Sequence, residues 1–84
     1  MYIEYHKHFK KKYDVLSPKL RGKVQEKILL FASNPHAPEL NNHKLHGEYE
    51  GCHSINITGD LRAIYIINKE YVQFLKLDTH SNLY

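Results

Sequence analysis

The sequence predicts one small α+β domain, in the order β-α-α-β-β-β, with two N-terminal helices packed on a small, twisted, mainly antiparallel sheet. Two patterns support this prediction. Apolar residues recur at helical spacing from Phe9 to Phe31, whereas a period of two and β-branched residues dominate residues 52–77. The length of 84 residues suits a single core, so we take residues 1–84 as one domain.

The first half of the chain supplies one strand and both helices. Residues 2–6 are aromatic and β-branched, which predicts a short strand. A lysine-rich segment follows, with three apolar residues at helical spacing: Phe9, Tyr13 and Leu16. Ser17 and Pro18 suit the cap and the first position of a second helix, which we expect to end near Ser33. Its apolar stripe comprises Leu20, Val24, Ile28 and Phe31.

The second half supplies the remaining strands. Residues 34–42 contain two prolines and three asparagines, which predicts a loop. Strands are expected at residues 52–57, 61–67 and 71–77, joined by short turns into an antiparallel meander. The predicted core consists of Phe9, Tyr13, Val24, Ile28, Phe31, Ile55, Ile57, Ile64 and Phe74.

Charge is distributed unevenly along the chain. The net charge is +3, but residues 1–32 carry eight cations against three anions. Such a basic face attracts RNA, DNA or an acidic protein, although lysines also serve simply to solvate a helix. No apolar stretch approaches the length of a membrane span and no secretory signal is apparent, so we expect a cytoplasmic protein. A single cysteine, Cys52, excludes an internal disulfide and a cysteine-based zinc cluster.

Acid–base groups and cations gather in the second half of the sequence. The candidates are His43, Lys44, His46, Asp60, Arg62, Lys76, His80 and Tyr84. The spacing of the histidines does not suit a metal site, and no Gly-rich phosphate loop is present, so we expect neither a metal nor a cofactor. The mixture suits cleavage of RNA through its own 2′-hydroxyl, in which a base, a cation and an acid act together.

Arg62 is the most informative of these candidates because it interrupts an apolar strand. A half-buried guanidinium needs an anionic partner, and its fork geometry fits a phosphate. An ion pair with Asp60 or Glu50 would satisfy it equally well.

Three segments resemble the patterns of the RelE/ParE toxin superfamily, and most closely its YafQ-like branch of mRNA interferases. They are HKLHGEYEG (residues 43–51), SINITGDLRAIY (residues 54–65) and LDTHSNLY (residues 77–84). The resemblance implies a toxin of a type II toxin–antitoxin system that cuts mRNA on the ribosome. It also implies a cognate antitoxin that neutralises the toxin.

The resemblance also assigns catalytic roles residue by residue. His80 matches the C-terminal catalytic histidine, and His43 matches the histidine that opens the first motif. Asp60 matches an acidic position that orients a histidine or acts as the base, and Arg62 matches the arginine that holds the scissile phosphate. His43 is equally open to interpretation as an ordinary loop residue.

Substrate binding is expected from Lys44, Lys76 and Tyr84. Lys76 lies where relatives often carry a cation, and Tyr84 matches a terminal aromatic that stacks on a base. Alternatively, Tyr84 packs the end of the chain onto the sheet.

Three departures from the family pattern leave other functions open. Asn56 stands where several relatives carry histidine, Leu61 where they carry tryptophan, and Asp78 where the pattern has glycine. One alternative is a ParE-like toxin that inhibits DNA gyrase, although that subfamily lacks the Thr79–His80 pair seen here. The other is a degenerate member that only binds its antitoxin.

Overall fold

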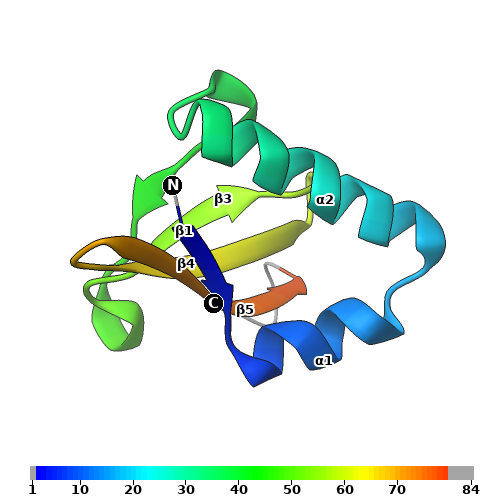
Figure 1. Ribbon diagram of the computed structural model, residues 1–84, viewed down its shortest axis with the longest axis horizontal. Helices are drawn as coiled ribbons and strands as arrows, with labels where there is room; N and C mark the ends of the chain where they lie inside the picture. The colour runs from blue at the N-terminus through cyan, green and yellow to red at the C-terminus, as the bar shows by residue number, and fades with distance from the viewer. Residues whose placement is uncertain (1, 80–84) are drawn as a thin grey trace.

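The computed structural model describes residues 2–79 and has the predicted α+β architecture (Figure 1). Its elements are β1 (Tyr2–Tyr5), α1 (Lys7–Val15), α2 (Pro18–Ser33), the 3-10 turn η1 (Pro38–Leu40), β2 (His43–Lys44), the 3-10 turn η2 (Gly47–Tyr49), β3 (His53–Asn56), β4 (Leu61–Asn68) and β5 (Tyr71–Thr79). The predicted helices and the four predicted strands are confirmed. The short strand β2 and both 3-10 turns were not predicted. No helix among residues 2–79 has the length and apolar character needed to cross a membrane.

The strands form one mixed sheet in the order β1-β5-β4-β3-β2. β1 runs parallel to β5, and every other neighbouring pair is antiparallel. The β4–β5 register shifts because Ile64 pairs with Lys76 whereas Tyr65 pairs with Phe74, which leaves Leu75 as the extra residue of a bulge. The bulge changes the alternation of side chains, so that Phe74 and Leu77 both face the helices.

Local sequence chemistry sets the ends of the second helix. The Ser17 hydroxyl accepts a hydrogen bond from the Leu20 N–H at 3.2 Å, and Pro18 occupies the first helical position, as predicted. The Arg21 guanidinium donates to the Leu16 carbonyl at 2.9 Å and to the Asp14 carbonyl at 3.5 Å, which ties the two helices together at their connection.

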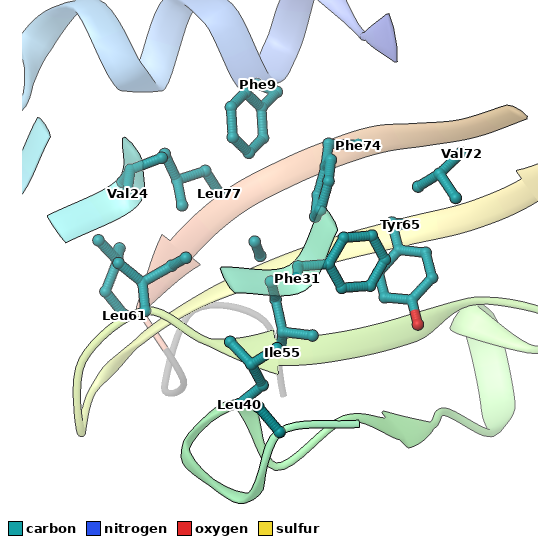
Figure 2. Packing of buried hydrophobic residues seen from close by; sticks show 13 residues of the cluster. Phe9, Val24, Phe31, Leu40, Ile55, Leu61, Tyr65, Val72, Phe74 and Leu77 are labelled. Carbon is teal, nitrogen blue, oxygen red and sulfur yellow. The ribbon is translucent and has the colours of Figure 1, made fainter. Parts of the chain in front are cut away.

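The main core lies between the helices and one face of the sheet. Its largest fully buried side chains include Phe31, Phe74 and Ile55. Figure 2 shows Phe31 close to Tyr65, with Phe9 pointing from α1 toward β5. The Phe31 ring centroid is 4.8 Å from that of Tyr65 and 5.5 Å from that of Phe74, both in edge-to-face geometry.

Three residues of the predicted core are placed differently. Tyr13 and Ile28 are only half-buried at the margin of the main core, because α1 and α2 present more apolar surface than the sheet covers. Ile64 is fully buried, but on the opposite face of the sheet, where it packs with Leu45 and Cys52 in a second, small cluster.

A backbone excursion covers part of that opposite face. The segment from Leu45 to Cys52 folds back on itself, with a hydrogen bond from the Leu45 N–H to the Cys52 carbonyl at 2.9 Å. Gly47 and Gly51 have φ values of +71° and +88°, a left-handed region that glycine adopts without steric penalty. We call the sheet surface that faces away from α1 and α2 the open face.

Candidate active site

The strand register brings several predicted site residues together on the open face. Opposed residues in neighbouring strands share a face, and their Cβ atoms are typically about 5 Å apart. One row across the sheet consists of His43, Ser54, Ile64 and Lys76. The adjacent row consists of Asn56, Arg62 and Asp78. The structure therefore places an imidazole, a guanidinium and an ammonium group on one surface, although they are distant in sequence.

Arg62 is half-buried and is held by the turn between β3 and β4. Its Nη1 donates to the carbonyl of Thr58 at 3.1 Å and to the carbonyl of Gly59 at 3.0 Å. Within residues 2–79, Arg62 forms no ion pair with Asp60 or Glu50, so the ion-pair alternative is wrong for the described chain. Both acceptors are neutral, so they orient the guanidinium without neutralising its charge.

Asp60 lies at the exposed tip of the same turn. Its N–H donates to the Thr58 hydroxyl at 3.3 Å, and the same hydroxyl accepts from the Leu61 N–H at 3.0 Å. These hydrogen bonds fix the backbone of the turn. They leave the Asp60 carboxylate exposed beside the row that contains Arg62.

His43 is exposed on the edge strand β2. Its Nδ1 lies 2.8 Å from the Asn41 carbonyl oxygen. Because a carbonyl only accepts, Nδ1 carries the hydrogen in this contact, and in the neutral ring Nε2 then has the free lone pair. The open face thus has a proton acceptor at its β2 edge.

Lys44 does not join His43. It is the next residue in β2, so it faces the other side of the sheet, where its register partner is His53. The His53 ring stacks on Tyr65 with centroids 5.1 Å apart. Burial lowers the pKa of His53, and the nearby charge of Lys44 lowers it further.

Lys76 reaches across the open face to a residue that was not assigned a function from the sequence. Its Nζ donates to the Tyr49 hydroxyl at 3.4 Å and lies 5.8 Å from the centre of the Tyr49 ring. Tyr49 belongs to the first family-like motif, but its contact with Lys76 depends on the fold of the segment around η2. This contact places the Tyr49 ring beside the row that contains His43 and Lys76.

Strand β3 contributes two further polar side chains that were not predicted as site residues. Among the described residues, Ser54 Oγ is buried without a hydrogen-bond partner, and the same is true of Asn56 Oδ1. Ser54 lies in the row of His43 and Lys76, and Asn56 is directly opposite Arg62. Leaving a buried polar atom unpaired is costly, and contact with a water molecule, an ion or a reacting group would remove that cost. His53 Nδ1, on the opposite face, is in the same state. The sequence signals were the alternation of β3, which places Ser54 and Asn56 on one face, and, for Asn56, its position where several relatives carry histidine.

Asp78 neighbours Arg62 and also contacts α1. It lies opposite Arg62 in the register, and its carboxylate is 3.5 Å from Lys12 Nζ. His80 and Tyr84, the two predicted C-terminal site residues, lie outside the described residues. Within residues 2–79, no three His, Cys, Asp or Glu side chains come together as metal ligands.

Comparison with known proteins identifies related sequences and folds. A family model described as the bacterial toxin of type II toxin–antitoxin systems, YafQ, matches residues 1–84. The structure of YafQ from E. coli strain BL21(DE3) is 21% identical, with a TM-score of 0.83, and the match covers 98% of this chain and 96% of that one. No curated protein sequence gives a significant match.

Two other solved structures extend the comparison. A YoeB/ParE toxin from Agrobacterium tumefaciens is 18% identical, with a TM-score of 0.79 and coverage of 95% of this chain and 99% of that one. The toxin chain of the E. coli DinJ–YafQ toxin–antitoxin complex is 21% identical, with a TM-score of 0.80 and coverage of 98% and 94%. At these identities the structural likeness shows a shared fold.

Proposed function

The chain belongs to the YafQ family of type II toxin–antitoxin toxins, and from this premise we propose that it is an endoribonuclease that cleaves mRNA on the ribosome. The reaction is attack of the ribose 2′-oxygen on the adjacent phosphorus. The 5′-oxygen of the next nucleotide leaves, and a 2′,3′-cyclic phosphate forms. This chemistry needs a base, a cation at the phosphate and an acid, but no metal or cofactor.

The state of Arg62 is the observation that carries this proposal. The hydrogen bonds to Thr58 and Gly59 use Nη1, and no other residue in the described part of the chain bonds to Nε or Nη2, which can therefore donate to phosphate oxygens. Among residues 2–79 no carboxylate forms an ion pair with Arg62, and such a fixed cation stabilises the charge that develops on the phosphate in the transition state. Lys76 adds a second positive charge in the neighbouring row.

In this proposal His43 acts as the general base and His80 as the general acid. In the neutral ring, His43 Nε2 accepts the 2′ proton while Nδ1–H remains bonded to the Asn41 carbonyl. His80, which the family pattern marks, donates the proton to the departing 5′-oxygen. Asp60 and Tyr84 assist as orienting and base-stacking groups, and Lys44 contacts RNA outside the scissile position.

A cognate antitoxin is the second part of the proposal. The E. coli relative has been solved in complex with the DinJ antitoxin. By analogy, an antitoxin neutralises this chain. The basic character of residues 1–32 favours an acidic protein partner.

Primer extension on a reporter mRNA after brief induction in bacteria tests the nuclease proposal. The comparison uses the wild type, His80→Ala, and His36→Ala as a matched control in an exposed loop. Discrete breaks within the reading frame that persist in His36→Ala and vanish in His80→Ala support the proposal. Arrested growth with intact mRNA would favour gyrase inhibition instead, and normal growth would favour a member that only binds its antitoxin.

A further inference from the structure

Tyr49 is an aromatic residue of the open face that the proposed reaction does not use. It lies in the turn η2, and its ring packs against the small apolar cluster of Leu45, Cys52 and Ile64. The residue is only half-buried, so part of the ring is exposed. An exposed aromatic surface supported by protein on one side is a common stacking site for the bases of single-stranded RNA.

The ammonium group of Lys76 contacts one end of this ring. Its Nζ is 3.4 Å from the Tyr49 hydroxyl oxygen but 5.8 Å from the ring centre. A cation directly above the ring centre would lie farther from the hydroxyl oxygen than from the centre, so Nζ is displaced toward the hydroxyl end. The contact therefore orients the ring and leaves its faces uncovered by the ammonium group.

The backbone around Tyr49 is held by hydrogen bonds. The Tyr49 carbonyl accepts from the Cys52 N–H at 2.9 Å, and the Gly47 carbonyl accepts from the Glu50 N–H at 3.1 Å. The positive φ values of Gly47 and Gly51 allow the chain to reverse on both sides of the ring. A ring that is fixed before binding loses little conformational entropy when a base stacks on it.

The strand register places this ring near the proposed scissile phosphate. Arg62 pairs with Asp78, so Lys76, two residues earlier in β5, is the diagonal neighbour of Arg62. Such neighbours on one face of a sheet are about 7–8 Å apart. Adjacent phosphates of a single strand can span this separation, with one phosphate on Arg62 and the next on Lys76. The base of that nucleotide then lies beside the ring that Lys76 contacts.

The charges around Tyr49 favour a base over a phosphate at this position. Glu48 and Glu50 precede and follow it, and both are exposed. His46 Nδ1 is 3.9 Å from the Glu50 carboxylate. Carboxylates repel a phosphate but not a neutral base. The segment around η2 therefore suits a nucleobase, whereas Arg62 and Lys76 suit the RNA backbone.

We propose that Tyr49 stacks on the base of the nucleotide next to the scissile phosphate and so positions the RNA for cleavage. The inference rests on the proposed function, because it takes single-stranded RNA as the substrate. It adds an RNA-binding residue from the segment around η2 to those that the sequence predicts.

The test measures stacking by fluorescence. The probe is a short 2′-O-methyl oligouridine with one 2-aminopurine, a base whose fluorescence falls when it stacks. Tyr49→Leu removes the aromatic face but keeps an apolar contact with the cluster, whereas Tyr49→Phe keeps the face and removes the hydroxyl bonded to Lys76. Tyr13→Leu is the matched control, because Tyr13 is also half-buried and its hydroxyl accepts a hydrogen bond from Gln25, but it lies on the helical side of the sheet.

The wild type, Tyr49→Phe and Tyr13→Leu should quench the fluorescence and bind with similar dissociation constants. Tyr49→Leu should lose the quenching, and its dissociation constant should rise by about 5- to 150-fold, the range for loss of one stacked base. Replacing 2-aminopurine with an abasic sugar should weaken binding to the wild type by a similar factor and change binding to Tyr49→Leu little, as measured by competition. Thermal unfolding curves check that each variant is folded.

Three results would overturn the inference. The first is quenching that persists in Tyr49→Leu. The second is an equal loss in Tyr49→Phe and Tyr49→Leu, because the hydroxyl rather than the ring face would then hold the RNA. The third is a wild type that does not bind the oligonucleotide or binds the abasic form equally well, and this comparison decides the matter even if Tyr49→Leu does not fold. Failure of the nuclease proposal is separately visible, as intact mRNA in the primer-extension assay while the quenching remains.

Discussion

Replacing Arg62 with alanine should reduce RNA cleavage far more than it reduces stability. Removal of one donor to a developing oxyanion typically lowers the rate by about 10²–10³-fold. The same change removes two hydrogen bonds to the Thr58 and Gly59 carbonyls. Because these bonds are partly solvated, we expect a loss of about 1–2 kcal/mol in the free energy of unfolding.

The expected loss of cleavage is much larger than the expected loss of stability could produce. Small domains are stable by about 0.05–0.15 kcal/mol per residue, which gives roughly 4–13 kcal/mol for this chain. Even at the lower limit, a loss of about 2 kcal/mol leaves more than about nine molecules in ten folded. Unfolding therefore cannot account for a hundredfold loss of cleavage.

Arg21 provides a matched control for Arg62. It is also half-buried and donates to two backbone carbonyls, those of Leu16 and Asp14, but it lies on α2 away from the open face. Urea unfolding should show a similar loss for Arg21→Ala and Arg62→Ala, whereas single-turnover cleavage should fall only for Arg62→Ala. If cleavage by Arg62→Ala falls no further than its folded fraction, the assigned role is refuted.

Three further predictions concern the stability of the core, the pKa of the half-buried His53, and RNA affinity. Phe31→Ala should lower the free energy of unfolding by about 3–5 kcal/mol, measured in urea, because the ring is 1% exposed in the centre of the core. Burial lowers the pKa of His53 from its usual 6.5, so the unfolded chain takes up the proton first as the pH falls. Stability should therefore decrease between pH 7.5 and pH 5.5, and His53→Asn should lose less over that interval. Lys76→Gln should reduce the salt dependence of binding to a non-cleavable 2′-O-methyl RNA by about 0.7 in the log–log slope if Lys76 contacts one phosphate.

Each of these predictions has a contradicting result. A Phe31→Ala variant with an unchanged urea midpoint would mean that the core is not packed as described. Parallel pH profiles for His53→Asn and the wild type would remove His53 as a source of the pH dependence. An unchanged salt slope for Lys76→Gln would place the RNA away from that end of the open face.

Much of the helical layer could be predicted from the sequence because its signals are local. The Ser17–Pro18 cap and the apolar stripe of α2 act over a few residues, and the structure places the helix at Pro18–Ser33. The extent of burial was less predictable. Tyr13 and Ile28 have the correct spacing for core residues, but whether a stripe is covered depends on how far the sheet extends beneath it.

The sheet was harder to predict where pairing is non-local. β4 carries apolar residues on both faces, so its sequence alone does not reveal whether Ala63 or Ile64 faces the helices. The bulge at Leu75 depends on the β4–β5 register, and it determines which face Lys76 occupies. Likewise, β2 contains only two residues, and two residues carry no periodic signal.

In the candidate site, too, the residue types could be predicted from the sequence, whereas their contacts depend on how the strands pair. The residue types of His43, Arg62 and Lys76 could be predicted, and the register places them on one face. The partners of Arg62 could not be predicted, because backbone carbonyls of a turn have no sequence signature. The separation of Lys44 from His43 follows from strand alternation once β2 is known.

The chemical ends of the cleaved RNA test the central claim most directly. Fragments from cells induced for the wild-type chain would be mapped at the cleavage site, with cells expressing Arg62→Ala as the control. Attack by the 2′-hydroxyl predicts a 2′,3′-cyclic phosphate, or the phosphate left by its opening, on the upstream fragment and a 5′-hydroxyl on the downstream fragment. A 5′-phosphate with a 3′-hydroxyl at that position would contradict the mechanism.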